Sequence, residues 1–424
     1  MKRKGVSVFV DRDCSGIISR SNIEIDTFLF AYERAVSDES AVSLTMPVVS
    51  DQYDSMSFLH PIFEMNLPEG VLRERLELMF SKAVKNFDAL TLLEIVGRSQ
   101  IGRLRYASEG VPLEDVPPEN IDSILAYDGA EDLFGDLLQR FARYSGISGM
   151  QPKVLIRNES GAFDKITDKG ATHIVKSFNP REYPELAANE FFSMQAAQHA
   201  GLPTAKVSLS ENRSILAVER FDRNESGNYF GVEDFCVLSG IRASGRYSGS
   251  YEDLAKKVSI FVSPENHQAA MKQLFGMIAL STIIKNGDAH LKNFAILYDR
   301  PSVNVRLAPV YDMLSTVAYD TKDAMALEID GSKAYPSRKQ LIQFARQSCG
   351  LSNQNAELIL ADTSSGVKKT IAEIKEYAAN HQDFQHNADR LIKLFSKGLK
   401  NIENNGGDGA GSGTSGGGRR LDKK

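Results

Sequence analysis

The chain has 424 residues, of which 42% are hydrophobic, and its formal net charge is −5. Such a chain can bury a large core and form two or three domains, and its negative charge argues against strong autonomous binding to nucleic-acid phosphates. No apolar run approaches the roughly 20 residues of a membrane helix. Residues 1–5 lead into an alternating strand rather than an apolar signal segment, so we expect a cytoplasmic protein with no membrane partner.

The first hundred residues alternate strand-like and helix-like patterns. Strands are predicted at residues 6–10 and 41–49, and helices at residues 68–84 and 88–96. Asn86 or Asp88 is the predicted cap of the second helix. Three prolines and several acidic residues between Gly110 and Asn120 are typical of a surface linker, so we expect a domain boundary there.

A strand-rich stretch follows and then gives way to helices. Strands are predicted at residues 154–157, 173–177, 206–210 and 214–221, with a turn at 158–161 and a helix at 184–200. After Asp222 the pattern is mostly helical. Residues 404–424 are rich in glycine and serine and hold too few apolar side chains to fold, so we interpret them as a flexible tail.

The most informative stretch is NGDAHLKNF at residues 286–294, followed by APVYD at residues 308–312. It carries an aspartate and an asparagine five positions apart, Asp288 and Asn293, and a second aspartate, Asp312, behind a short apolar run. Phosphoryl transfer needs hard oxygen ligands for magnesium and a carboxylate facing the attacking hydroxyl. We therefore predict that Asp288 is the base and that Asn293 and Asp312 bind magnesium.

The elements predicted around this stretch bring its residues together. A helix is expected to end at Asn286 and Gly287, and strands at residues 294–298 and 303–310 are joined by a turn at 299–301. Asp288 and Asp312 would then flank a hairpin and lie close in space. Taken singly, they are ordinary turn or cap residues and His290 is an ordinary buried histidine. The combination favours the catalytic interpretation.

Five ordered segments resemble the HipA family of bacterial serine/threonine kinases, the toxin halves of toxin–antitoxin pairs. They are residues 147–153, 172–178, 217–222, 286–294 and 309–312, and residues 67–70 and 95–102 resemble that family's N-terminal subdomain. The resemblance implies an α+β, two-lobed protein-kinase-like fold. Its parts would be an N-terminal α/β subdomain at 1–107, a kinase N-lobe at 120–221, a mostly helical C-lobe at 222–403 and the tail at 404–424.

The resemblance also implies a nucleotide site. Lys176 lies in an apolar strand, where a lysine costs desolvation unless an anion meets it, and Glu190 on the following helix would orient it. The resemblance places Lys153 at the phosphates, and Glu219 and Phe221 at the hinge that holds the adenine. Alternatively, Lys176 snorkels from an edge strand and Glu190 solvates its helix face.

A glycine loop is expected at residues 145–149, where Ser148 and Gly149 would cover the ATP phosphates. Members of the family often carry a self-phosphorylated serine in this loop, and the matching position here is Gly146. Self-phosphorylation would therefore use another hydroxyl. Ser148 is the first candidate and Ser145 the second.

These expectations converge on an ATP- and magnesium-dependent protein serine/threonine kinase, in which Asp288 accepts the hydroxyl proton and His290 braces the catalytic loop. The resemblance implies the toxin of a type II toxin–antitoxin system, a target such as an aminoacyl-tRNA synthetase, and a small helix-turn-helix antitoxin of the HipB type through which DNA would be reached. Two alternatives are a nucleotide-binding pseudokinase that acts with the antitoxin as a co-repressor, and a small-molecule or lipid kinase.

Overall fold

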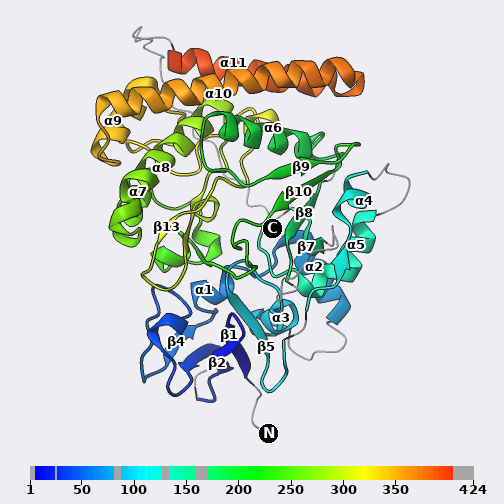
Figure 1. The fold of residues 1–424 in the computed structure, drawn as a ribbon, viewed down its shortest axis with the longest axis vertical. Coiled ribbons are helices and arrows are strands. Elements are labelled where there is room, and N and C mark those ends of the chain that lie inside the picture. The colour runs from blue at the N-terminus through cyan, green and yellow to red at the C-terminus, as the bar shows by residue number, and fades with distance from the viewer. Residues whose placement is uncertain are drawn as a thin grey trace.

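The computed structural model describes residues 5–23, 26–80, 87–113, 115–126, 133–149, 151–158, 170–178 and 180–403. These residues form an α+β molecule with three sheets, in which the first sheet lies at one end and the last helices at the other (Figure 1). The predicted tail at 404–424 and most of the predicted turn at 158–161 lie outside the described residues.

The first sheet is antiparallel and has the strand order β4-β3-β2-β1-β5. Its strands are β1 (Val6–Val10), β2 (Asp13–Arg20), β3 (Thr27–Tyr32), β4 (Tyr53–Met56) and β5 (Leu104–Ser108), accompanied by helices α1 (Pro61–Glu64), α2 (Gly70–Phe80) and α3 (Ala89–Val96). The Asp88 carboxylate caps α3 as predicted, because it accepts a hydrogen bond from the Thr91 backbone N–H at 2.9 Å.

The second sheet has the strand order β6-β7-β8-β10-β9. Its strands are β6 (Pro118–Glu119), β7 (Lys153–Asn158), β8 (His173–Ser177), β9 (Val207–Leu209) and β10 (Ile215–Glu219), and its helices are α4 (Ile121–Leu125), α5 (Leu133–Phe141) and α6 (Leu186–His199). Successive side chains of a strand face opposite sides. Ile215 and Ala217 of β10 therefore enter a core shared with the first sheet, and Leu216 and Val218 enter the core of the helical lobe.

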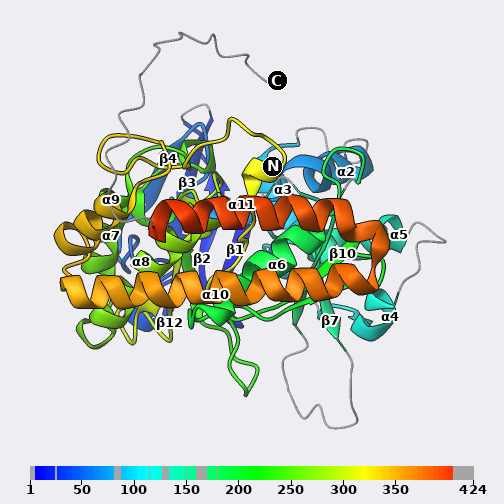
Figure 2. The same cartoon turned by 90° about the horizontal axis from the view of Figure 1, so that it is seen from above.

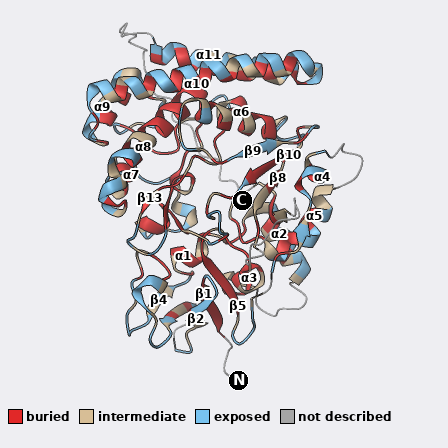
Figure 3. Ribbon diagram, viewed as in Figure 1, coloured by how far each residue is buried: buried red, intermediate tan, exposed pale blue. Residues whose placement is uncertain are grey.

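The C-terminal part surrounds a small third sheet and one long buried helix. The strands are β11 (Gly231–Asp234), β12 (Ala295–Tyr298) and β13 (Arg306–Leu307), and the helices are α7 (Tyr251–Phe261), α8 (Pro264–Ile284), α9 (Arg338–Gln347), α10 (Asn353–Asn380) and α11 (Gln385–Glu403). Helices α10 and α11 run side by side across this end (Figure 2), and only their inner faces are buried (Figure 3).

The strand predicted at residues 41–49 is wrong. This segment contains only an isolated bridge between Ser43 and Met46. Ala41, Val42 and Met46 are buried. The polar groups of the segment find a partner in a distant carboxylate, because the Ser43 hydroxyl and the Leu44 backbone N–H donate to Glu233 at 2.7 and 2.8 Å. Glu233 belongs to β11, so tertiary contacts replace the strand ladder that the pattern suggested.

Two further predictions are only partly right. The supposed surface linker buries Val116, which is 2% exposed, and pairs β6 in parallel with β7. The strand predicted at 303–310 shrinks to β13, because Ser302 and Asn304 adopt positive φ values of 62° and 51° that no strand accommodates.

Candidate active site

Two lysines stand opposite each other on neighbouring strands of the second sheet. In the antiparallel β7–β8 pair Lys153 is paired with Lys176, and paired residues project from the same face. Each is 5% exposed, and both line one cavity. Like charges directly opposite each other repel, and burial adds a desolvation cost. The arrangement therefore needs nearby carboxylates.

Glu190 and Asp312 supply those carboxylates. Lys176 Nζ donates to Glu190 Oε1 at 2.5 Å and to Asp312 Oδ1 at 2.6 Å. Burial lowers the pKa of Lys176, but the two carboxylates outweigh it and hold that pKa above its usual range. Lys153 has no such close partner among the described residues, and burial lowers its pKa. The expected Lys176–Glu190 contact is present, and the snorkelling alternative is wrong because β8 lies inside the sheet.

The predicted catalytic loop begins where α8 ends. The helix stops at Ile284, and Lys285 adopts a left-handed φ of 64°, which turns the chain away one residue before the expected stop. At Gly287 the loop passes very close to a neighbouring turn: a Cβ atom there would lie 2.2 Å from Asp323 Oδ2 and 2.4 Å from the Ala324 carbonyl oxygen. Glycine is the residue that this approach allows.

Asp288 reaches the same cavity as the two lysines. Its side chain is 40% exposed and accepts a hydrogen bond of 2.6 Å from the Tyr247 hydroxyl. Burial and the carboxylates of Asp312 and Asp323 raise the pKa of Asp288 to about 6, although Tyr247 acts in the opposite direction. A carboxyl with this pKa is mostly ionised at pH 7 and still close enough to it to take up a proton.

His290 packs beside Asp288. Its ring lies edge-on to Tyr247 with 4.9 Å between centroids, and its Nε2 is 3.9 Å from Asp288 Oδ1. Burial, assisted by the positive charge of Arg246, lowers the pKa of His290 to about 4, so the ring is neutral at pH 7. A neutral, buried ring fits the expected bracing role better than proton transfer.

Asn293 lies behind Asp312. Its Nδ2 donates to Asp312 Oδ2 at 3.3 Å, and its Oδ1 is buried yet accepts no hydrogen bond from the residues that the structure describes. Buried polar atoms without a partner are uncommon, and an ion is one of the groups that can satisfy such an atom. The amide oxygen and the Asp312 carboxylate are hard oxygen donors of the kind that magnesium takes.

The glycine loop closes over one side of the cavity. Gly149 has a φ of 124°, and a Cβ there would lie 2.3 Å from Lys153 Nζ, so glycine lets the ammonium reach the loop backbone. Gly146 is equally constrained, because its Cβ would meet Gln100 Nε2 at 1.8 Å. A serine at position 146 would therefore not fit this conformation.

The two serines of the loop differ completely in their surroundings. Ser148 lines the cavity. Ser145 is fully buried, donates to the Phe141 carbonyl at 2.7 Å and accepts from the Leu155 backbone N–H at 2.8 Å. The expectation that Ser145 lies on an accessible loop is wrong, because its hydroxyl joins α5 to β7 instead.

A residue of the N-terminal subdomain also enters the cavity. Glu69 Oε2 accepts from Arg246 Nη1 at 3.0 Å, and Glu69 Oε1 accepts from Lys292 Nζ at 3.0 Å and from Ser148 Oγ at 2.6 Å. Lys292 Nζ also donates to Ser148 Oγ. Burial raises the pKa of Glu69, but Lys292, Ser148 and Arg246 outweigh it and lower that pKa to about 2.

The side chains of the two predicted hinge residues, Glu219 and Phe221, lie in different surroundings. Phe221 lines it and packs against Tyr311 with 5.5 Å between ring centroids. The Glu219 side chain is half exposed, pairs with Lys206 at 3.2 Å and is absent from the described cavity lining. The expected hinge role concerns backbone groups rather than this side chain, so the role of Glu219 stays a prediction. Asp222, next to Phe221, instead accepts from the Gly102 backbone N–H at 2.6 Å, which ties the hinge to the N-terminal subdomain.

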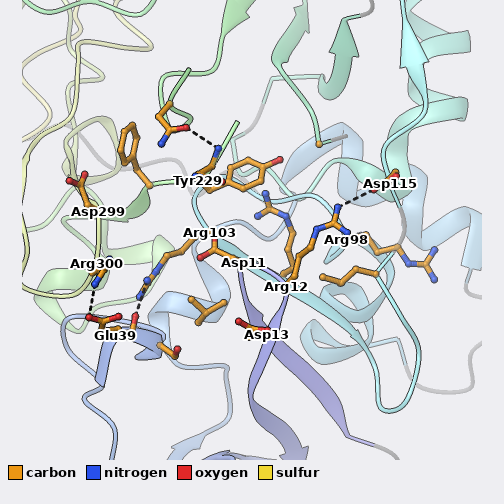
Figure 4. A pocket seen from close by; sticks show the side chains of 18 of the residues that line it. Asp11, Arg12, Asp13, Glu39, Arg98, Arg103, Asp115, Tyr229, Asp299 and Arg300 are labelled. Carbon is orange, nitrogen blue, oxygen red and sulfur yellow. Dashed lines mark hydrogen bonds and ion pairs between the residues drawn. The ribbon is translucent and has the colours of Figure 1, made fainter. Parts of the chain in front are cut away.

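A larger cavity of about 870 Å³ opens at the first sheet (Figure 4). Five arginines and five carboxylates line it, so the opposite charges balance. Arg12 pairs with Asp115 at 3.4 Å and Arg300 with Glu39 at 2.6 Å. None of the residues predicted to be catalytic lines it. The smaller cavity, which Asp288, Lys176 and Asp312 line, is therefore the better candidate active site.

Two lobes, a buried strand lysine paired with a helix glutamate, and an aspartate–asparagine–aspartate set at one cavity define a protein-kinase-like molecule. Residues 145–371 match the family model of the HipA-like C-terminal domain and residues 6–107 that of the HipA N-terminal domain. The chain therefore belongs to the HipA family.

Individual relatives agree with this assignment. The chain is 26% identical over 377 residues to Y4dM of Sinorhizobium fredii, named as a candidate kinase, with 81% of this chain and 85% of that protein covered. Y4mE of the same organism, also named so, is 29% identical over 330 residues, which cover 71% and 75%. Among solved structures, HipA from the Shewanella oneidensis MR-1 complex of HipA, HipB and operator DNA has a TM-score of 0.65 at 21% identity, covering 92% of this chain and 97% of that one. The predicted two-lobed, kinase-like α+β fold is confirmed.

The structure thus brings most of the predicted site residues together. Glu190 contacts Lys176 and Asn293 contacts Asp312. The predicted residues that line the cavity are Lys153, Lys176, Phe221, Asp288, His290, Asp312, Ser148 and Gly149. The sequence reasoning missed Glu69, Arg246, Tyr247 and Lys292. Lys292 belongs to the motif at residues 286–294 and Glu69 to the segment at residues 67–70, so both positions carried a sequence signal, whereas Arg246 and Tyr247 carried none.

Proposed function

We propose that this protein is an ATP- and magnesium-dependent protein serine/threonine kinase. The observation that carries the proposal is the convergence on one cavity of Asp288 and the Lys176–Asp312 ion pair, with Asn293, whose amide oxygen is orphaned, hydrogen-bonded to Asp312. These residues come from β8, the catalytic loop and the segment after β13. Phosphoryl transfer depends on such positioned charges more than on covalent chemistry by the protein.

Each residue has a definite task in this proposal. Lys176 and Lys153 bind the ATP phosphates, and Glu190 keeps Lys176 in place. Asp288 takes the proton from the substrate hydroxyl. The hydroxyl oxygen forms a bond to the γ-phosphorus of ATP while the bond between that phosphorus and the β,γ-bridging oxygen breaks, and ADP leaves. The pKa of about 6 suits this base at neutral pH. Tyr247 orients the Asp288 carboxylate through their 2.6 Å hydrogen bond.

The residues behind the cavity fit a magnesium ion. Asp312 and Asn293 would hold it through a carboxylate and an amide oxygen. The ion would supply positive charge against the phosphates. Because Lys176 draws Asp312 toward β8 in this structure, ion binding and the ion pair involve the same carboxylate.

The biological role follows from the family. HipA of Shewanella oneidensis was solved with HipB and operator DNA in a toxin–antitoxin system. By analogy, this chain would be a toxin that pairs with a HipB-like antitoxin and reaches DNA through it. An aminoacyl-tRNA synthetase is the substrate that the resemblance suggests, since its phosphorylation would stop translation.

The test is transfer of labelled γ-phosphate from ATP to proteins of a bacterial lysate, with and without magnesium. Asp288→Asn should abolish labelling, whereas Asp320→Asn, a change at an exposed carboxylate of a neighbouring turn, should not. Phosphoamino-acid analysis of the labelled band should yield phosphoserine or phosphothreonine. ATP binding by calorimetry without any transfer would instead support the pseudokinase alternative.

A further inference from the structure

Glu69 is a half-buried ionic residue that the proposed mechanism does not use. It precedes α2 in the N-terminal subdomain, and its side chain is 20% exposed. Its three partners come from three separate places: Ser148 from the glycine loop, Lys292 from the catalytic loop and Arg246 from the segment before α7. One carboxylate therefore connects the two loops that must face each other across the nucleotide phosphates.

The geometry of these contacts makes the connection specific. Both oxygens of the carboxylate are used, with Oε1 shared by Ser148 and Lys292 and Oε2 held by Arg246. The Lys292 and Arg246 side chains are 11% and 19% exposed, so water screens the charges only partly. Lys292 immediately precedes the predicted magnesium ligand Asn293, and its carbonyl oxygen accepts from Tyr311 at 2.7 Å. A displacement of Lys292 would therefore disturb the catalytic loop.

We propose that Glu69 is a positioning residue that holds the glycine loop closed against the catalytic loop. The N-terminal subdomain would then complete the kinase site rather than merely adjoin it. The carboxylate also engages the Ser148 hydroxyl, so Ser148 would be withheld from phosphorylation while Glu69 is in place. This inference rests on the proposed kinase function, but its first test does not require catalysis.

The alternative is that Glu69 only fastens the subdomain to the helical lobe. The chain offers a matched control for that possibility. Glu64 of α1 pairs with Arg242 at 2.9 Å, its side chain is 15% exposed, and it spans the same two parts of the molecule five residues earlier. In the described structure, Glu64 contacts neither loop. If Glu69 only anchored the subdomain, its removal should affect the glycine loop no more than removal of Glu64.

The first experiment is hydrogen exchange of the peptide covering residues 145–149 in Glu69→Ala and Glu64→Ala. Glu69→Ala should accelerate exchange in this peptide about tenfold, since a lost charge-assisted hydrogen bond of about 1.4 kcal/mol corresponds to a factor of ten. Glu64→Ala should leave it unchanged. Unchanged exchange in Glu69→Ala, or equal acceleration in both variants, would overturn the proposal.

The second experiment separates positioning from stability through phosphate transfer. Glu69→Gln keeps an acceptor for Ser148 but weakens the pairing with Lys292 and Arg246, so its loop exchange should fall between wild type and Glu69→Ala. In Glu69→Ala, the rate of phosphate transfer to lysate proteins should fall. Ser148 should gain phosphate faster than in wild type, as measured by intact mass and peptide mapping. A parallel fall in both activities would reject the withholding role, because a released Ser148 should gain phosphate faster.

The two proposals fail in different ways. A wild-type protein that binds no ATP by calorimetry would refute the kinase proposal and leave the exchange result to decide whether Glu69 closes the loop. Normal transfer with unchanged loop exchange in Glu69→Ala would refute the positioning role and leave the kinase proposal standing.

Discussion

Lys153 and Lys176 are directly opposed on β7 and β8, and only Lys176 has a carboxylate within 2.6 Å on two sides. This asymmetry gives the two lysines different electrostatic surroundings on the same face of one sheet. Lys176 is held in a fixed position by its ion pairs, whereas Lys153 keeps its ammonium against Gly149. We infer that Lys153 is the more available cation for an incoming phosphate.

Lys176→Met tests the stability side of this arrangement. The substitution leaves Glu190, which is 1% exposed, without its partner. Breaking a buried ion pair from one side typically costs about 3–5 kcal/mol. Chemical denaturation should show a loss of this order, and a double variant with Glu190→Gln should recover much of it. If the double variant is as unstable as the sum of the single ones, the two residues are not coupled.

Asp288→Asn should abolish phosphate transfer while preserving the fold. The wild-type rate should fall as the pH drops below about 6, because protonated Asp288 cannot accept the hydroxyl proton. Ionisation of Asp288 favours activity but disfavours the fold. Because the pKa of Asp288 in the folded protein lies above the ordinary value of 3.8, the ionised carboxylate lowers the free energy of unfolding as the pH rises above that value. The variant should therefore melt at an equal or higher temperature than wild type at pH 7.5. A clear loss of thermal stability would contradict this.

Asp312→Asn should remove the magnesium dependence of ATP binding. Although burial opposes ionisation, Lys176 and Lys153 hold the pKa of Asp312 below its usual range, so its charge stabilises the fold at neutral pH and this contribution is lost in acid. We therefore expect lower thermal stability at pH 7 and a smaller difference from wild type in acid. Calorimetry with and without magnesium gives the second readout. A variant that still binds ATP more tightly with magnesium would place the ion elsewhere.

Self-phosphorylation, if the protein performs it, should fall on Ser148 and not on Ser145. Ser148→Ala should eliminate the phosphopeptide. Ser145→Ala should leave phosphorylation unchanged and instead cost about 1–3 kcal/mol of stability, because the Leu155 N–H and the Phe141 carbonyl lose a buried partner. Peptide mapping after incubation with ATP and magnesium decides between the sites. Phosphate on Ser145 would mean that α5 and β7 separate during the reaction.

The local chemistry of the site could be predicted from the order of the residues along the chain. Asp288, His290 and Asn293 lie within six residues of one another, so their spacing on a single loop was readable, and Asp312 follows after a short hairpin. The Asp88 cap and the helices α3, α6 and α8 also depend on neighbouring residues, and the sequence patterns predicted them. Local patterns are reliable where the interactions that decide them are close in the chain.

Contacts between distant segments, in contrast, depend on how the whole chain packs. Glu69 meets Lys292 across 223 positions, and Lys153 meets Lys176 through a strand register that no motif specifies. Burial also distinguished Ser145 from Ser148, although they are three residues apart in one loop. The physical reason is the same in each case: packing determines which polar groups lose water, and a group that loses water must find its partner wherever the fold brings one.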